Sequence, residues 1–168
     1  RGQDSHFQIY GQNVREFPPI PDFEGEPDFT LKIGPLASGI DRTAFAAARE
    51  STRYAINGVL WERKGKKLQL IATDGRRLAW GTVALEKAGD AECSAIVPVK
   101  TLHLISKLRQ DPEEIVEVKT TANQIFIRMP RATISSVLVE GHFPKYEDVI
   151  PREIESEITA AGPDYGAA

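Results

Sequence analysis

The sequence predicts an α+β fold in which two helices pack on antiparallel β-sheet. Two segments, 36–50 and 99–109, carry apolar residues at helical spacing. The short segments around them alternate between polar and apolar residues and end at turn residues, as half-buried strands do. The elements occur in the same order in both halves of the chain. We therefore expect a duplicated β-α-β-β-β unit, although the two halves are not alike in sequence.

The first half begins with a strand predicted at 29–33, where apolar and polar residues alternate. Gly34-Pro35 ends this strand, and proline suits the first turn of the helix predicted at 36–50. The apolar residues of that helix would face the core: Leu36, Ile40, Ala44 and Ala47. Three strands should follow, at 56–62, 67–73 and 77–83, joined by turns at Gly65 and at Asp74-Gly75.

The second half repeats this order. A strand is predicted at 94–97, and Pro98 again stands at the start of a helix, here 99–109. Its buried face would consist of Leu104, Ile105 and Leu108. Three strands should complete the half, at 115–119, 124–129 and 132–138. Before residue 28, the proline-rich stretch 17–21 excludes a helix and is typical of a linker.

Composition excludes several classes of protein. The 168 residues are 41% hydrophobic and 27% charged, and no stretch approaches the roughly 20 apolar residues of a membrane span. One cysteine, Cys93, excludes a disulfide framework or a multi-cysteine metal site and fits a reducing compartment. Because the chain opens Arg1-Gly2-Gln3 without an initiating Met, we expect a piece of a longer protein.

The net charge of −3 hides an uneven distribution. Residues 1–28 hold two basic and six acidic side chains, and residues 140–168 hold two and seven. The middle, 29–139, therefore carries +6. A basic middle between acidic ends is a weak indication of a polyanionic partner.

Part of this basic charge lies on the predicted helices. Lys100, His103 and Lys107 share one face of the second helix at i, i+3 and i+7, with no acidic residue in 99–109. The first helix would present Arg42 and Arg49, with Arg53 beyond them. Such faces can attract DNA phosphates without reading sequence, or they can be ordinary solvated faces. The basic hairpin at 63–67 is compatible with a simple exposed turn.

Three segments, in this order and at these gaps, resemble the middle domain of the bacterial β sliding clamp family, the β subunits of DNA polymerase III. They are Arg53-Tyr54-Ala55-Ile56-Asn57-Gly58-Val59-Leu60-Trp61-Glu62, then Thr73-Asp74-Gly75-Arg76-Arg77-Leu78-Ala79, and Gly141-His142-Phe143-Pro144-Lys145-Tyr146 followed by Val149-Ile150-Pro151. Ile96-Val97-Pro98 opens the second helix between them. The set covers 53–151, and the β-α-β-β-β order extends the resemblance to Asp28.

The resemblance implies a DNA clamp fold and a division into three parts. Residues 1–27 would be the last strand of a preceding clamp domain plus a linker, 28–151 the central clamp domain, and 152–168 the start of a truncated third domain. The full-length parent would be a homodimeric ring around double-stranded DNA, whereas this fragment would be a monomer. It would act as a processivity factor in the bacterial cytoplasm, associated with the nucleoid and without catalytic activity or cofactor.

The resemblance also implies two sites. DNA would be contacted by basic residues of the helices and by a loop after the first helix. The helix residues are Arg42, Arg49, Lys100, His103 and Lys107, and the loop residues are Arg53 and Tyr54. Tyr54 could instead pack at the start of the next strand. Clamp-binding peptides of the polymerase catalytic subunit, the clamp loader and other factors would dock in a groove formed by Ile56, Thr73, Gly75, Arg76, Leu78, Pro144, Asp148 and Val149. Three positions depart from the family pattern: Ala55 replaces a frequent second Tyr, Arg76 a frequent His, and Asp148 a familiar Arg.

Two other classes of function are alternatives to a clamp. An enzyme is disfavoured because the chain shows no nucleophile elbow, no phosphate-binding loop and no paired-histidine metal motif. A nucleic-acid-binding or protein-interaction module outside the clamp family remains the alternative. Further β-α-β-β-β repeats on either side of this segment would distinguish the clamp from that module.

Overall fold

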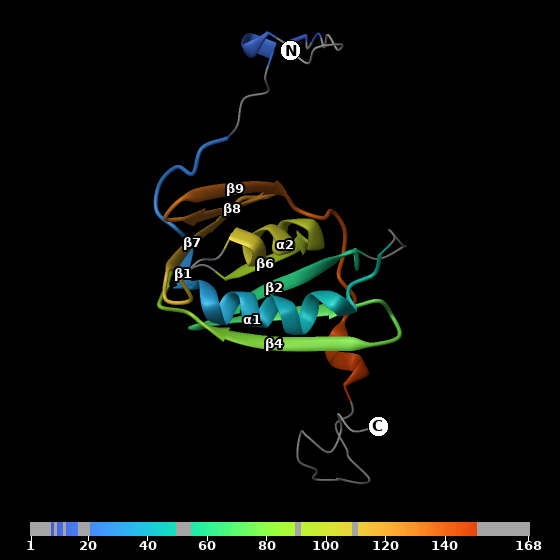
Figure 1. The fold of residues 1–168 in the computed structure, drawn as a ribbon. Helices are drawn as coiled ribbons and strands as arrows, with labels where there is room; N and C mark the ends of the chain where they lie inside the picture. The colour runs from blue at the N-terminus through green and yellow to red at the C-terminus, as the bar shows by residue number, and fades with distance from the viewer. Residues whose placement is uncertain are drawn as a thin grey trace, which may run out of the picture.

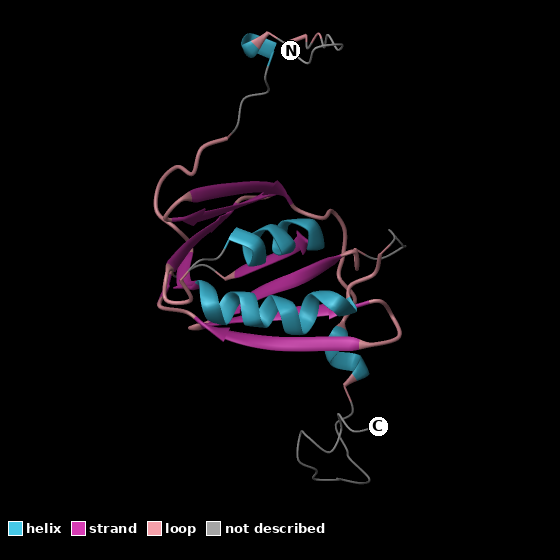
Figure 2. Ribbon diagram, in the orientation of Figure 1, coloured by secondary structure: helices cyan, strands magenta, loops and turns pink. Residues whose placement is uncertain are grey.

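The computed structural model describes residues 8, 10–11, 13–16, 21–49, 55–89, 92–108 and 111–150, so that all of 152–168 and about half of 1–27 lie outside them. Figures 1 and 2 show two helices lying against twisted sheets. The described elements are η1 (Val14–Glu16), β1 (Phe29–Lys32), α1 (Ile33–Thr43), η2 (Ala44–Ala46), β2 (Gly58–Lys64), β3 (Lys67–Thr73), β4 (Leu78–Ala84), β5 (Lys87–Ala88), β6 (Cys93–Pro98), α2 (Val99–Leu108), β7 (Ile115–Thr120), β8 (Gln124–Met129), β9 (Ala132–Val137) and η3 (Tyr146–Val149). No helix in these ranges is long and apolar enough to cross a membrane.

The strands form two antiparallel sheets, ordered β4-β3-β2-β6 and β5-β1-β7-β8-β9. The predicted α+β class and the β-α-β-β-β order of both halves are confirmed. The first strand of each half, however, joins the sheet that contains the three strands of the other half. Strand β1 lies against β7, with Leu31 opposite Val116, and β6 lies against β2, with Val97 opposite Val59. This exchange makes both sheets depend on both halves of the chain.

One main core joins the helices to both sheets. Its fully buried side chains include Leu31, Leu36, Trp61, Leu102 and Ile127. Helices α1 and α2 contact each other, and α1 packs on β3 and β4 while α2 packs on β6 and β9. Because each fully buried aliphatic side chain contributes about 1.5–3 kcal/mol, this shared core holds the two halves together.

The first helix differs from its prediction at both ends. It begins at Ile33, three residues early, so that Pro35 falls within its first turn, where proline is tolerated. It ends at Thr43, whose hydroxyl donates to the carbonyl of Gly39 at 2.8 Å, and a single 3-10 turn follows. The predicted helix to residue 50 is therefore wrong. Arg49 lies beyond the helix on an exposed bend.

The second helix has a different buried stripe from the one predicted. Leu104 and Leu108 were expected in the core but are 48% and 45% exposed. Thr101 and Leu102 are buried instead, together with the predicted Ile105. The sequence contains more apolar residues than one face needs, and the positions of β6 and β9 against α2 decide which of them are covered.

Strand predictions are closest where turns define both ends. Strands β3 and β8 have their predicted bounds, and the others differ by one or two residues at an end. The short strand β5, Lys87–Ala88, was missed because two exposed residues carry no alternation pattern. It pairs with β1, placing Lys87 opposite Thr30.

Gly58 begins β2 at a point of close approach. A Cβ atom added there would lie 2.8 Å from the carbonyl oxygen of Val97 and 2.8 Å from Cγ2 of Ile96. The neighbouring strand leaves no room for it, because Val97 is fully buried and its backbone is fixed in the sheet.

We predict that Gly58→Ala lowers the free energy of unfolding by about 1–3 kcal/mol, because the new methyl group overpacks the β2–β6 junction. Chemical denaturation followed by circular dichroism measures this loss. Gly11→Ala is the matched control, because nothing lies within 4 Å of a Cβ there. An unfolding midpoint equal to that of the unsubstituted chain would contradict the steric account.

Candidate functional site

The sheet β4-β3-β2-β6 is apolar on both faces. Val59 and Trp61 point from β2 into the main core, whereas Leu60 between them belongs to a second cluster on the opposite face. The same alternation places Ile71 of β3 and Ile96 of β6 on that opposite face. An antiparallel sheet with a solvated face would carry polar residues at these positions. A second layer of chain must therefore cover this face.

The covering layer is the segment 138–150, which we call the strap. Its backbone is attached to the sheet, because Val139 N–H donates to the carbonyl of Ile96 at 2.9 Å. Farther along, the carbonyl of His142 accepts from the N–H of Ala55 at 3.3 Å. Phe143 and Ile150 pack on the second cluster. The strap thus lies over the face of the sheet opposite the helices.

Tyr146 is the main anchor of the strap. Its ring is buried, 4% exposed, and its hydroxyl donates to Oε2 of Glu62 at 2.8 Å. Trp80 meets this ring edge-on, with the ring centroids 6.1 Å apart. Burial, followed by the hydrogen bond and the negative charge of Glu62, raises the pKa of Tyr146 above its usual range. The phenol therefore stays neutral and keeps donating at physiological pH.

Beside Tyr146 lies a groove between the strap and the β3–β4 turn. Its volume is about 410 Å³. It is lined by Ile56, Thr73, Gly75, Arg76, Arg77, Leu78, Pro144, Lys145, Tyr146 and Val149. Aliphatic and proline side chains form much of the lining, while Val149, 67% exposed, leaves an apolar edge open. Such a groove suits apolar side chains of a peptide or small molecule.

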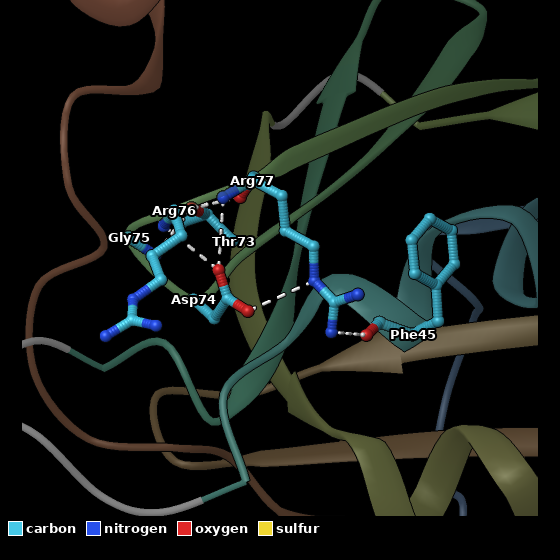
Figure 3. Close-up of polar contacts among 6 residues, drawn as sticks. All are labelled: Phe45, Thr73, Asp74, Gly75, Arg76 and Arg77. Atoms are coloured by element: carbon cyan, nitrogen blue, oxygen red, sulfur yellow. Dashed lines mark hydrogen bonds and ion pairs between the residues drawn. The ribbon is translucent and has the colours of Figure 1, made fainter.

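The turn at 73–77 holds one wall of the groove in place (Figure 3). Thr73 Oγ1 donates to the carbonyl of Arg77 at 2.7 Å and accepts from the N–H of Gly75 at 3.0 Å. The carboxylate of Asp74 accepts from the N–H groups of Arg76 and Arg77. Gly75 has a φ of +86°, a conformation that favours glycine. The backbone therefore requires this Thr-Asp-Gly sequence whether or not a ligand binds.

Arg77 connects the turn to the end of the first helical segment. Its guanidinium donates to Asp74 Oδ2 at 3.1 Å and to the carbonyl of Phe45 at 2.9 Å. It also lies 5.4 Å from the centre of the Phe45 ring, in the cation–π range. In Figure 3 Arg76 extends away from this network. Arg76 is thus the exposed, cationic edge of the groove, and Arg77 is a structural brace.

Hydrogen bonds explain the ionisation of Asp74. The N–H of Arg76, and after it the N–H and guanidinium of Arg77, hold the pKa of this carboxyl below its usual range. The charge of Asp74 therefore adds to the stability of the turn only while the carboxyl is ionised.

The structure brings together every predicted groove residue except Asp148. In the single 3-10 turn η3, successive residues point in different directions, so Val149 lines the groove while Asp148 does not. Three lining residues were not predicted: Arg77, Lys145 and Tyr146. All three fall inside the quoted motifs, but one-dimensional spacing does not show that two motifs face each other.

The predicted DNA-contacting residues lie elsewhere. Arg42, Lys100, His103 and Lys107 are exposed on α1 and α2, on the side of the sheet opposite the strap. No ion pair found among the described residues involves any of these four. The exposed side of α2 was expected to be purely basic. It also contains the exposed Leu104 and Leu108, so that expectation is wrong. Arg53 and Tyr54 lie outside the described residues.

Known proteins resemble this chain over most of its length. A family model described as the central domain of the DNA polymerase III β subunit matches residues 30–145. The β sliding clamp of Haemophilus influenzae is 32% identical over 148 residues, which cover 88% of this chain and 40% of that protein. The β sliding clamp of Escherichia coli is 29% identical over 160 residues, 95% of this chain and 43% of that protein.

Solved structures agree with these sequence matches. The DNA polymerase III β subunit of Pseudomonas aeruginosa superimposes with a TM-score of 0.77 at 33% identity, covering 84% of this chain and 39% of that one. The sliding clamp of Bacillus subtilis gives a TM-score of 0.81 at 27% identity, covering 91% and 40%. The chain thus spans about 40% of the length of these relatives.

We predict that Asp74→Asn lowers the melting temperature at pH 7, because the amide replaces a charged acceptor. Since the pKa of Asp74 is lowered on folding, its contribution is full above the unfolded value of about 3.9 and is lost as the pH falls through the folded pKa. The deficit should therefore shrink as thermal unfolding is followed from pH 7 to pH 2. Asp148→Asn is the control. If the loss of melting temperature in Asp74→Asn did not change with pH, the charge of Asp74 would not be its cause.

Proposed function

The chain belongs to the family of DNA polymerase III β subunits, whose central domain it matches, and we propose from this that it is part of a sliding clamp. The full-length protein would be a homodimeric ring that encloses double-stranded DNA. It would act as a processivity factor without catalytic activity, tethering the polymerase catalytic subunit, the clamp loader and other factors through their peptides. It would work in the bacterial cytoplasm, at the nucleoid. Residues 28–151 would form the central domain, flanked by parts of the neighbouring domains.

One observation carries this proposal: two surfaces of different chemistry lie on opposite faces of one sheet. The helices occupy one face of β4-β3-β2-β6, and the strap with its groove occupies the other. A ligand on the helices and a ligand in the groove therefore do not compete for space. A protein that holds a polymerase on DNA needs this separation.

The helix side suits DNA that must slide. Arg42, Lys100 and Lys107 are exposed cations, and the described residues contribute no ion pair to them. Cations on long side chains attract the phosphate backbone in any register along the duplex, because this attraction carries no sequence information. Tight base contacts would instead oppose movement along the DNA.

The groove side suits a short peptide with apolar side chains. Leu78, Pro144 and Val149 offer apolar contact, while Arg76 presents a cation at the edge. The walls are held in place by the ion pair between Asp74 and Arg77 and by the hydrogen bond from the buried Tyr146 to Glu62. A wall fixed before binding loses little entropy when the peptide docks. The cationic Arg76 favours a peptide that carries an acidic residue near its apolar side chains.

We predict that Lys100→Glu with Lys107→Glu weakens binding of the full-length protein to duplex DNA and lowers its salt dependence. Removing two phosphate-neutralising cations should reduce the slope of log affinity against log salt by about 1.8. Fluorescence anisotropy over a salt series measures this slope. The same change at Lys64 and Lys67, both exposed in the β2–β3 hairpin, is the control. Equal slopes for both double variants would overturn the assignment of DNA to α2.

Leu78→Lys tests the groove. We expect it to raise the dissociation constant of an apolar clamp-binding peptide at least about tenfold, because it removes a leucine contact of about 1.5–3 kcal/mol and adds a charge beside Arg76. Isothermal titration calorimetry with the full-length protein measures the change. Thr82→Lys, on the same strand and outside the groove, is the matched control. Unchanged affinity for Leu78→Lys would place peptide binding elsewhere.

A further inference from the structure

A second depression lies at the β2–β3 hairpin. Its volume is about 690 Å³, and it shares no lining residue with the groove. It is lined by Arg63, Gly65, Lys66, Glu86, Lys87, Ala88, Gly89 and Glu92. Three of these side chains are cations and two are carboxylates. The depression thus includes much of the basic hairpin that the DNA and peptide surfaces leave without a role.

Arg63 is the unusual member of this set, because its side chain is buried. The residue is only 4% exposed, at a position where β2 pairs with Leu68 on one side and Cys93 on the other. Its Nη1 donates to the carbonyl of Gly89 at 2.8 Å and, at 3.4 Å, to that of Gly65. Its Nε and Nη2 atoms are buried with no hydrogen-bond partner.

No carboxylate among the described residues forms an ion pair with this guanidinium. Glu86 and Glu92 line the same depression, yet neither forms an ion pair with Arg63. Nor does the neighbouring thiol provide a negative charge, because burial raises the pKa of Cys93 and keeps it protonated. Neutral carbonyls alone do not balance a buried cation, since buried charges in proteins are otherwise paired.

We propose that this depression binds a phosphate group, with Arg63 as its principal ligand and Lys66 and Lys87 as supporting cations. A guanidinium presents N–H groups in a planar fork that matches two phosphate oxygens, and here one edge of that fork is unused. Because Nε and Nη2 are themselves buried, phosphate would bind once rotation about the terminal torsions of Arg63 turns this edge towards the depression. The phosphate could be free or carried by a nucleotide, because both present the same oxygens.

The test is titration of the 168-residue chain with inorganic phosphate at constant ionic strength, followed by calorimetry and thermal unfolding. We expect saturable binding and a melting temperature that rises with phosphate. Arg63→Met should abolish both, while being at least as stable as the unsubstituted chain without phosphate, because it removes a buried unpaired charge. No saturation by phosphate, or undiminished binding to Arg63→Met, would overturn the proposal.

Two double variants keep the test decisive if Arg63→Met does not fold. Lys66→Met with Lys87→Met removes two cations that line the depression and should weaken phosphate binding at least about threefold. Lys64→Met with Lys67→Met removes two cations from the same hairpin outside the depression and should leave binding unchanged. Equal weakening by both pairs would show general attraction to a basic hairpin and would refute a defined site.

The source of the phosphate is tested by titrating adenosine monophosphate as well. Tighter binding of adenosine monophosphate than of inorganic phosphate would indicate that the site takes a nucleotide, and equal binding would indicate free phosphate.

Discussion

Burial of the sheet β4-β3-β2-β6 on both faces is the constraint on which the rest of this structure depends. A strand buried on one face can alternate polar and apolar residues, but here β2 is buried at every residue of 58–61 and β3 at every residue of 70–73. The helices cover one face, and the strap covers the other. Without the strap, Leu60, Ile71 and Ile96 would be exposed to water. The groove is therefore a by-product of a layer that the sheet needs for stability.

The groove and the helix surface differ in how their geometry is maintained. Directional hydrogen bonds hold the groove: Tyr146 to Glu62 at one wall, and Asp74 to the backbone and side chain of Arg77 at the other. Apolar packing of the opposite side holds the helices, and their exposed cations are free of ion pairs among the described residues. A rigid groove favours selective recognition of one peptide class, whereas mobile surface cations favour diffuse attraction to a polyanion.

Charge is also divided between surface and interior. Exposed cations cost little because water solvates them, and this holds for Lys100 and Lys107. Arg63 lies at the other extreme, with 4% exposure and two polar atoms without partners. Buried N–H groups without partners each cost about 1–3 kcal/mol, which is why an anion bound at Arg63 would stabilise the chain. The local composition of the hairpin, rich in lysine and arginine, does not reveal this difference.

Local signals in the sequence predicted the α+β class and the β-α-β-β-β order, because hydrophobic periodicity and turn residues do not depend on distant contacts. The groove residues were instead predicted from the resemblance to the clamp family, and the structure brings seven of the eight together. Tertiary structure alone decided that β1 and β6 exchange sheets, since many pairings satisfy the same alternation. It also exposed Leu104, ended α1 at Thr43, and turned Asp148 away from the groove while bringing Arg77 and Tyr146 into its lining. Each outcome depends on which surfaces meet in space, and residue order does not specify that.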